Sequence, residues 1–597
     1  MNTMFKHTNI TSGFLKDKQI LNRKTTINAI YDRFFETGRF DALECKWTPE
    51  STILQRPHIF WDSDVAKWIE AASYIIAKNP DEALEKKIED AIDSIEKNQL
   101  DDGYFNSYYI TSPEEKRFTK RGDHELYCAG HLIEAAVAYY YATGKDRLLK
   151  IMEKYADLID RIFVKEHTAS FDTPGHEEIE IALIKLYKCT GKKKYLDMCR
   201  YFLLTRGNSV KDGDTIYDQS NTDLYNISSA VGHCVRACYL FTAMAEYAQE
   251  ANDEKMMESC RRVFDDIVNS KMYITGGIGS TYIGEAFTIP YNLPSETSYA
   301  ETCASIALMF FAQKMLNHEA KGIYADIIEK TIYNSILSGL SLDGEKFFYE
   351  NALEINTSNE EKNNSTPTKE RFPASQRLKV FSCSCCPPNV SRVLATLENY
   401  IYHYSNGTYF IDQFCTSEFN DGNIIIKQKT EYPVNGKVKI TFDGVKKAAI
   451  RIPSWCDNFS IDAEYKIKDG YAYIKNPTCI NFDMELIPKL YARNEEVNDC
   501  ANKTALLMGP VVYCAERIDN PVNLHRLYID KNLTTKVEFD KEFGLYTIVA
   551  DGYIRKTSIA LYENLSEKFE KTKIRLIPYY SFANRGKSDM IIWMNYR

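Results

Sequence analysis

Three cysteines crowd into one short segment of the chain, KVFSCSCCPPNVSR. They are Cys383, Cys385 and Cys386, and Pro387 and Pro388 follow directly. Proline restricts the backbone at its own position and at the residue before it, so adjacent thiols fixed in this way could approach one metal ion. Buried thiols that simply pack beside a rigid turn explain the same residues equally well. The segment therefore poses a choice between metal chemistry and packing.

A second set of possible ligands lies well before this segment, in SYAETCASIALMFF, where a helix is expected to begin. It consists of Glu301 and Cys303. Zinc accepts thiolate and carboxylate ligands, and four of them complete a tetrahedral site. The candidate zinc ligands are Glu301, Cys303, Cys385 and Cys386. Their spacing matches no common zinc-finger pattern, so the spacing alone leaves both interpretations open.

The same residue types could also catalyse a reaction. A cysteine beside a metal is held as thiolate, which is the nucleophilic form of the side chain. One cysteine could therefore be both ligand and nucleophile. In GGIGSTYIGEAF, Glu285 follows Gly284 among apolar neighbours, a setting that raises a carboxyl pKa and suits a general acid. A solvated loop glutamate is the alternative interpretation of Glu285.

Three histidines each follow a glycine near the start of a helical segment. They are His131, His176 and His233. If the segments are equivalent repeats, these side chains project from one rim and could hydrogen-bond a polyhydroxylated ligand. Metal ligation and burial in the core are the alternatives for each of them.

Helices must position most of these residues. HLIEAAVAYYYATGK and HEEIEIALIKLYKCTGKKKYL both carry apolar residues at helical spacing, and Gly144 and Gly191 are expected to end the two helices. A period of about 50 residues with two helices per unit predicts helical hairpins. About six hairpins closed into a ring would form an (α/α)6 barrel over residues 1–402. An open solenoid is the structural alternative.

The second part of the chain has a different pattern. Short runs of alternating and β-branched residues, separated by Gly, Asn, Asp and Pro, predict one β-sandwich domain at 403–500 and another at 501–597. The predicted fold class is thus a helical barrel followed by β-sandwich domains. The polar segment from about 354 to 376 is expected to be a long loop that borders the site.

Charge and composition exclude several kinds of partner. A net charge of -9 gives nucleic acid no broad basic surface to contact. The first residues lack the apolar stretch of a signal peptide, and no apolar run is long enough for a membrane helix. The 16 cysteines are then expected to be reduced thiols of a cytoplasmic protein. Nothing in the sequence decides between a monomer and a homodimer.

Several motifs together resemble one known family. They are HELYCAGHLIEA, TPGHEEIE, AVGHCVRACYL, GGIGS with GEAF, YAETCAS, CSCCPPN, RIPSWC, MGPVVYCAE and PYYSFANRG. This set is similar to the zinc- and cysteine-dependent β-L-arabinofuranosidases of glycoside hydrolase family 127 along nearly the whole chain. The resemblance implies a six-hairpin barrel with β-sandwiches, and a retaining exo-glycosidase that releases L-arabinofuranose from non-reducing β-L-arabinofuranosides.

The resemblance also implies roles for individual residues. Cys385 would be the nucleophile that forms a thioglycosyl-enzyme, and Glu285 the general acid/base. Zn2+ would be bound by the four candidate ligands named above, with no direct ligand role for Cys383. Sugar contacts would come from His131, His176, His233, Glu329 and Tyr349.

The resemblance does not determine the natural glycoside or its aglycone. The expected partner is a small oligosaccharide or glycoside. Two other functions stay open from the sequence: a related zinc-cysteine glycosidase that acts on another plant-derived sugar, and a carbohydrate-binding protein in which zinc is structural.

Overall fold

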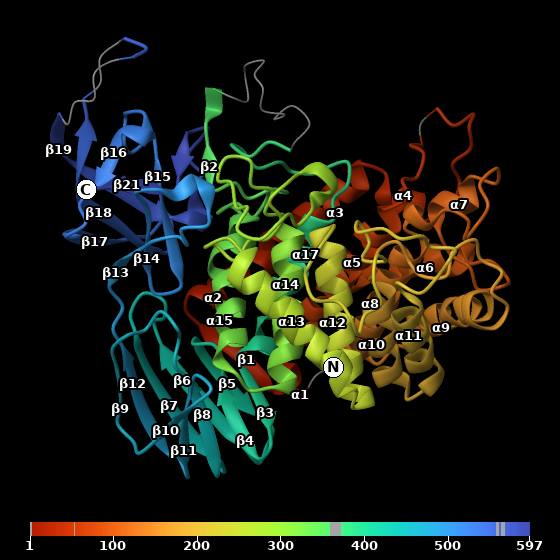
Figure 1. Cartoon of the computed structure of the whole chain (residues 1–597). Coiled ribbons are helices and arrows are strands. Elements are labelled where there is room, and N and C mark those ends of the chain that lie inside the picture. The colour runs from red at the N-terminus through yellow and green to blue at the C-terminus, as the bar shows by residue number, and fades with distance from the viewer. Residues whose placement is uncertain (1–2, 53, 359–371, 557–559, 563–567) are drawn as a thin grey trace.

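The computed structural model describes residues 3–52, 54–358, 372–556, 560–562 and 568–597. Helices make up its amino-terminal region and β-sheets its carboxy-terminal region (Figure 1), which confirms the predicted division into a helical part and later β-sheet domains. Among the described helices, none is both long and apolar enough to cross a lipid bilayer.

Most helices come in consecutive pairs that pack on each other. The pairs are α5 (Trp61–Lys78) with α6 (Glu82–Asn98), α8 (Glu125–Thr143) with α9 (Arg147–Ile159), α10 (Ile179–Thr190) with α11 (Lys193–Thr205), α12 (Cys234–Ala251) with α13 (Glu254–Ser270), and α14 (Thr302–His318) with α15 (Gly322–Thr331). Gly144 and Gly191 end α8 and α10 with φ of 77° and 70°. These left-handed angles favour glycine, so the predicted helix ends are confirmed.

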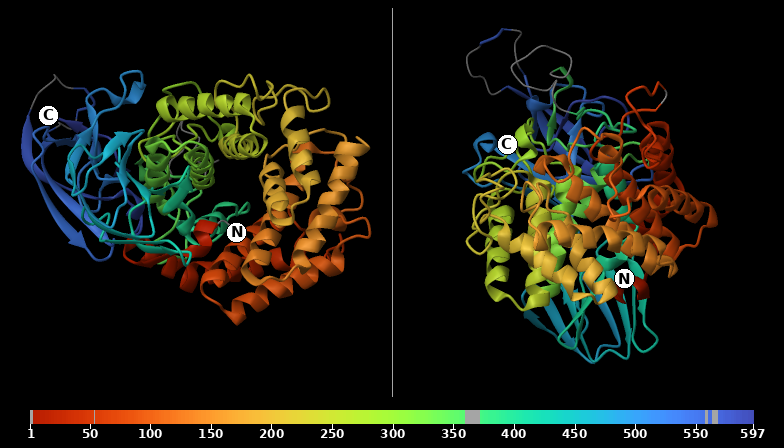
Figure 2. Two further views of the ribbon diagram at one scale, coloured as in Figure 1. Left: turned by 90° about the horizontal axis from the view of Figure 1, so that it is seen from below. Right: turned by 90° about the vertical axis from the view of Figure 1, so that its right-hand side faces the viewer.

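The first helices of successive pairs form a closed series of contacts. α5 packs on α8, α8 on α10, α10 on α12, and α12 on α14. The short helix α17 (Cys386–Leu394) packs on both α14 and α5 and so closes the series into a ring (Figure 2, left). Its outer neighbours come from the start of the chain, namely α3 (Ile27–Glu36) and the turn Asn22–Thr26 that follows α2 (Phe14–Leu21). The Asn22 side-chain amide donates to the Ser391 carbonyl at 2.9 Å.

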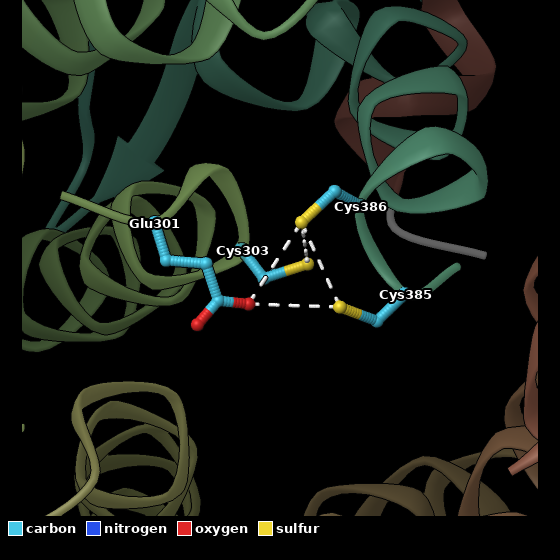
Figure 3. A group of neighbouring side chains, drawn as sticks. All are labelled: Glu301, Cys303, Cys385 and Cys386. Atoms are coloured by element: carbon cyan, nitrogen blue, oxygen red, sulfur yellow. Dashed lines mark hydrogen bonds between the residues drawn. The ribbon is translucent and has the colours of Figure 1, made fainter. Parts of the chain in front are cut away.

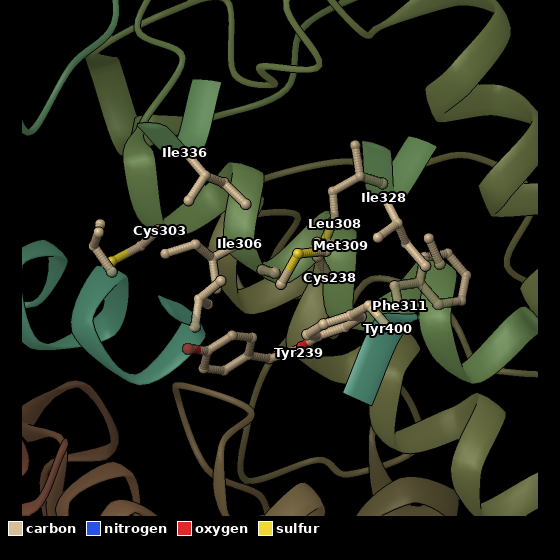
Figure 4. Close-up of a cluster of buried hydrophobic side chains, with 14 of the residues drawn as sticks. Cys238, Tyr239, Cys303, Ile306, Leu308, Met309, Phe311, Ile328, Ile336 and Tyr400 are labelled. Atoms are coloured by element: carbon tan, nitrogen blue, oxygen red, sulfur yellow. The ribbon is translucent and has the colours of Figure 1, made fainter. Parts of the chain in front are cut away.

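Buried side chains from α12, α14 and α15 pack together between the inner and outer helices (Figure 4). Cys238 is fully buried among them and contributes as a small apolar side chain. Cys303 lies in the same buried cluster, at the start of α14. Each buried aliphatic or aromatic side chain contributes about 1.5–3 kcal/mol to stability. The wall that carries Cys303 is therefore fixed by packing.

The described strands form three sheets. The first has the order β1 (Thr8–Ser12), β5 (Thr416–Asn420), β6 (Ile425–Thr430), β7 (Lys437–Asp443), β12 (Cys479–Met484), β9 (Phe459–Ile461). The second has the order β10 (Lys466–Lys468), β11 (Tyr471–Lys475), β8 (Lys447–Arg451), β4 (Thr408–Ile411), β3 (Tyr402–Ser405).

The third and largest sheet belongs to the end of the chain. Its order is β13 (Pro488–Tyr491), β14 (Lys503–Met508), β21 (Met594–Tyr596), β16 (Leu527–Ile529), β18 (Leu545–Arg555), β19 (Phe569–Pro578), β15 (Val511–Glu516), β20 (Met590–Ile591), β2 (Glu354–Ile355), with β17 (Thr535–Asp540) on β18. β1 and β2 come from the helical part of the chain, so they bind the sheets to the helices. Of the predicted loop at 354–376, residues 359–371 lie outside the described part.

Candidate active site

The four predicted ligands meet where α14 and α17 begin (Figure 3). The Cys386 sulfur lies 3.4 Å from that of Cys303 and 3.6 Å from that of Cys385. Oε1 of Glu301 lies 3.6 Å from the Cys385 sulfur and 3.8 Å from the Cys386 sulfur. The ligand atoms all lie within 4.8 Å of one another. We call these four residues the thiolate cluster.

The geometry of the thiolate cluster fits a metal ion such as zinc. Zinc–sulfur bonds of about 2.3 Å place two thiolates of a tetrahedron about 3.8 Å apart, close to the separations found here. Oε2 of Glu301 is buried and forms no hydrogen bond in the described part of the chain. Oε1 is the oxygen that faces the sulfurs, so a cation bound there would offset the cost of burying this carboxylate beside thiolates.

Local sequence explains why two adjacent cysteines point into one site. Cys385 is the N-cap of α17 and Cys386 its first residue, while Pro387 and Pro388 occupy the first turn. Proline is tolerated there because the first-turn amides have no partner within the helix. The positive end of a helix dipole favours anionic groups, and both α14 and α17 direct their N-termini at the thiolate cluster.

Cys385 differs from the other thiols of the cluster in its protonation. Hydrogen bonds from neighbouring thiols lower the pKa of Cys385 well below its ordinary value, which outweighs the effect of burial. Burial is the main cause that raises the pKa of Cys303 and Cys386. The hydroxyl of Tyr349 lies 3.4 Å from the Cys385 sulfur. Burial raises the pKa of Tyr349, so this phenol stays protonated and can donate to a thiolate.

A cavity of about 400 Å³ opens beside the thiolate cluster, and Cys385, Tyr349 and Glu285 line it. Ligand pockets typically measure roughly 300–1,000 Å³, so the cavity can accept a monosaccharide. Cys385 is half-buried at its wall, whereas Cys386 is fully buried behind it. The cavity thus exposes one thiolate to a bound ligand.

Glu285 ends a short turn, Ile283–Glu285, in which Gly284 and Glu285 have φ of 67° and 52°. Its Oε2 lies 2.6 Å from Nε2 of His233. Nδ1 of His233 accepts the backbone N–H of Val235 at 3.2 Å, so Nε2 carries the proton and donates to Glu285. Glu285 is therefore a positioned group of the cavity rather than a solvated loop residue.

The expected rise in the pKa of Glu285 is wrong for the free protein. Burial does raise it, as the sequence argument proposed, but hydrogen bonds from His233 and Tyr299 outweigh burial and lower the pKa below its ordinary value. His233 lies on another hairpin and Tyr299 beyond the GEAF motif, so the residues next to Glu285 could not reveal these donors.

The three predicted histidines do not occupy equivalent positions. His176 and His233 line the cavity, in front of α10 and at the N-cap of α12. His131 lies inside α8, is fully buried, and places Nδ1 3.2 Å from Glu178. The histidine that lines the cavity at the start of α8 is instead His124, its N-cap. The prediction of a common rim is thus wrong for His131.

Tyr127 explains the displacement of His131 from the cavity. Its ring lies between the two, 4.6 Å from the ring of His131, and lines the cavity itself. The Lys67 ammonium donates to the Tyr127 hydroxyl at 2.8 Å. Sequence reasoning missed Tyr127 and His124, although both stand in the HELYCAGH motif, because the start of α8 was placed one to two turns too late.

Glu329 lies outside the cavity, so its predicted contact with a sugar is not supported. It is buried on α15, where its carboxylate accepts from Arg451 at 2.6 Å, from the Tyr432 hydroxyl at 2.7 Å and from the Trp455 indole at 3.1 Å. Asp326 also pairs with Arg451. Glu329 therefore fixes the β-sheet region to the helices.

Two family models match the chain. The one described as "Beta-L-arabinofuranosidase, GH127 catalytic domain" matches residues 7–399, and "Glycoside hydrolase family 127 C-terminal domain" matches residues 488–595. The class of protein is therefore a glycoside hydrolase. More narrowly, the chain belongs to glycoside hydrolase family 127, as the sequence motifs predicted.

Individual relatives agree with this assignment. The non-reducing end beta-L-arabinofuranosidase of Bifidobacterium longum subsp. longum is 34% identical over 590 residues, covering 90% of this chain and 89% of that protein. The crystal structure of a GH127 beta-L-arabinofuranosidase from Geobacillus stearothermophilus has a TM-score of 0.92 at 35% identity, covering 99% of this chain and 100% of that one. Another GH127 beta-arabinofuranosidase has a TM-score of 0.89 at 30% identity, covering 99% and 97%.

Proposed function

We propose that this chain is a retaining exo-glycosidase that releases L-arabinofuranose from the non-reducing end of β-L-arabinofuranosides. One observation carries the proposal: a carboxyl group, Glu285, and a low-pKa thiol, Cys385, line the same cavity on either side of Glu301. Family membership and the names of the relatives support the sugar and the linkage.

We further propose that the thiolate cluster binds Zn2+ through Glu301, Cys303, Cys385 and Cys386. The tetrahedral separations and the burial of the Glu301 carboxylate beside three sulfurs support this assignment. When bound, the ion would supply positive charge that keeps the Cys385 sulfur deprotonated and stabilises it as a leaving group.

In the first step, the Cys385 thiolate attacks the anomeric carbon while Glu285 gives its proton to the departing glycosidic oxygen. The carbon–oxygen bond breaks, a carbon–sulfur bond forms, and the sugar is left as a thioglycosyl-enzyme on Cys385. Binding of the sugar expels water from the cavity, which penalises the carboxylate of Glu285 and favours the protonated form that this step needs.

In the second step, Glu285 acts as a general base. Its carboxylate takes a proton from water as the water oxygen attacks the anomeric carbon, and the Cys385 sulfur departs as thiolate. Two displacements at one carbon retain the configuration, as in glycosidases that use two carboxylates. The Nε2–H of His233 keeps the Glu285 carboxylate in place for this step.

Sugar contacts are proposed for His176, His233 and Tyr349, which line the cavity. Desolvation holds the pKa of His176 well below its ordinary value, so the imidazole is neutral and suits hydroxyl groups as donor or acceptor. Tyr349 would also keep the Cys385 sulfur oriented toward the anomeric carbon.

We also propose that the ring of helices is an (α/α)6 barrel, residues 1–402, and that the sheets form β-sandwich domains at 403–500 and 501–597. Contacts around the ring, with α17 paired to the first helices of the chain, support the barrel. β1 and β13 cross these proposed boundaries, since they pair with strands of the following domain. The cytoplasmic location and a possible homodimer stay predictions from the sequence alone.

The proposal is tested with methyl glycosides of β-L-arabinofuranose, its α anomer and other furanoses. We expect turnover of the β-L-arabinofuranoside, with β-L-arabinofuranose as the first product in NMR spectra. Denaturation during turnover should leave a sugar adduct that mass spectrometry locates on Cys385. Turnover confined to another sugar, or a first product of inverted configuration, would contradict the proposal.

A further inference from the structure

The position of Glu285 defines where the leaving group of a substrate must lie. The proton of the general acid goes to the glycosidic oxygen, so the leaving group starts next to Glu285. The Glu285 side chain is 31% exposed, whereas Glu301 deeper in the site is 1% exposed. The leaving group therefore extends outward, over the residues that surround Glu285 at the mouth of the cavity.

The ring of Tyr217 is one of the aromatic rings that line the cavity near Glu285. The Tyr217 ring packs against Gly284, where an added Cβ would lie 3.5 Å from two of its ring atoms. Tyr217 lines the cavity, yet 43% of the residue is exposed. The Arg236 guanidinium lies over the ring, 4.5 Å from its centroid. An aromatic ring supported from one side and open to solvent is suited to stacking.

The loop that carries Tyr217 is fixed before any ligand binds. The His233 backbone N–H donates to the Tyr217 carbonyl at 3.0 Å. The Arg206 guanidinium, fully buried, donates to the Asp218 carbonyl at 2.7 Å. A Cβ on Gly232 would lie 2.0 Å from the Ile216 carbonyl oxygen, so only glycine allows this close approach. A preorganised ring loses little entropy when a ligand stacks on it.

Two exposed apolar side chains neighbour Tyr217 and the Glu285 turn in the chain. Ile216 precedes it in the chain and is 58% exposed, and Ile283 precedes Gly284 and is 69% exposed. Apolar side chains exposed next to a cavity-lining segment can contact a ligand that extends out of the cavity. The apolar C–H face of a sugar ring matches this surface, while the hydroxyl edge of the ring stays in water.

We propose that Tyr217, flanked by Ile216 and Ile283, is the platform that binds the first sugar ring of the leaving group. It would make the enzyme select glycosides whose arabinofuranose is linked to another sugar over glycosides with a small leaving group. This inference rests on the proposed function, because Glu285 as the acid defines the direction of the leaving group.

The test compares kcat/KM on a β-L-arabinofuranosyl disaccharide with kcat/KM on methyl β-L-arabinofuranoside. Tyr217→Ala is expected to lower kcat/KM on the disaccharide by about fivefold to tenfold, as expected for loss of one stacking contact. On the methyl glycoside the change should stay within about twofold, because no ring occupies the platform. Tyr217→Phe keeps the ring and should retain the preference of the unmodified enzyme.

Two further variants keep the test decisive. Ile283→Ser changes the same surface without altering Tyr217 and should cause a smaller loss, about twofold and again confined to the disaccharide. Tyr404→Ala removes a 55% exposed tyrosine from β3, far along the chain in the β-sheet region, and should change neither rate.

If Tyr217→Ala and Ile283→Ser lower kcat/KM equally on both substrates, or lower it on neither, the platform is overturned. The proposed function stands in that case. Failure of the unmodified enzyme to hydrolyse either substrate would overturn the proposed function instead.

Discussion

Two of the buried acidic clusters of this protein differ in how their charge is neutralised. In the first, which we call the Arg451 cluster, Asp326 and Glu329 both pair with the fully buried Arg451 guanidinium. In the second, the thiolate cluster, Oε2 of Glu301 has no partner in the described part of the chain. Burial and the nearby Cys385 thiolate raise the pKa of Glu301 well above its ordinary value.

The role of a buried set of acids follows from what neutralises its negative charge. A set that the protein neutralises with its own cation, as Arg451 does, is complete and fixes two regions together. The thiolate cluster has no such ion pair among the described residues, since the nearby Lys67 ammonium donates to Tyr127, and we propose that a metal ion completes the cluster. Both sets contain a glutamate that the family resemblance singled out, but only Glu301 lines the cavity.

The largest effect should come from Cys385, the proposed nucleophile of the thiolate cluster. Cys385→Ser is expected to lower kcat/KM on a β-L-arabinofuranoside by at least about 10³-fold, because an alcohol of high pKa replaces a thiolate. Cys479→Ser, at an exposed cysteine of β12, is the matched control and should keep full activity. A folded Cys385→Ser protein that retains the rate of the unmodified enzyme would rule out cysteine catalysis.

Removal of the metal should have the next largest effect. Dialysis against a chelator is expected to lower activity by roughly 10³-fold, since the four clustered ligands would lose their common cation. Tm should fall as well, and added zinc should restore both. Metal content is measured by atomic emission. If a protein free of zinc and other metals keeps its activity, the thiolate cluster works without the ion we assign to it.

Glu285→Gln should lower kcat/KM by about 10²- to 10⁴-fold, the usual contribution of a general acid. The first step needs the protonated acid, and hydrogen bonds from His233 and Tyr299 lower the pKa of Glu285 despite its burial. The kcat/KM of the unmodified enzyme should therefore fall as the pH rises through the acidic range, where Glu285 of the free enzyme loses its proton. That dependence should disappear in the variant, and an unchanged pH profile would argue against Glu285 as the acid.

Arg451→Met should act on stability rather than on catalysis. It leaves Asp326 and Glu329 buried without their cation, which costs about 3–5 kcal/mol of unfolding free energy. Denaturant unfolding measures that loss. Below the transition, kcat on the methyl glycoside should stay within about threefold of the unmodified enzyme, because the Arg451 cluster touches no substrate. A selective loss of kcat in a stably folded variant would mean that the two clusters are coupled.

The smallest effect is expected for Cys383→Ser. Cys383 lies near the thiolate cluster but outside the set of ligand atoms that could share one ion. The Cys385 thiolate raises the pKa of Cys383, so this thiol stays neutral. Zinc content should be unchanged, and activity should fall by less than about threefold. Loss of one zinc equivalent would place Cys383 among the ligands.

Sequence patterns predicted the elements better than the details of the cavity. Gly144 and Gly191 end their helices as expected, because a left-handed C-cap is a local property. His131 was misplaced because its face of α8 depends on where that helix starts, at Glu125. Tyr217 was missed because its loop is fixed by arginines from other hairpins, which no local pattern reveals.

The same limit applies to Glu329 and, in part, to the thiolate cluster. Glu329 meets Arg451 across 122 positions of sequence, so its partner could not be inferred from α15 alone. Residue types and spacing identified the four ligands as candidates, and the family resemblance decided among them. The structure adds that their side chains do converge.

The closure of the ring by α17 has a consequence for how the protein is made. Cys303 and Cys386 are separated by 83 positions, and α17 docks against helices from the very start of the chain. On the ribosome, the early hairpins emerge and pack long before Cys385 and Cys386 leave the exit tunnel. The proposed metal site can form only after that, once α17 packs between α5 and α14, and metal uptake during synthesis would report this docking.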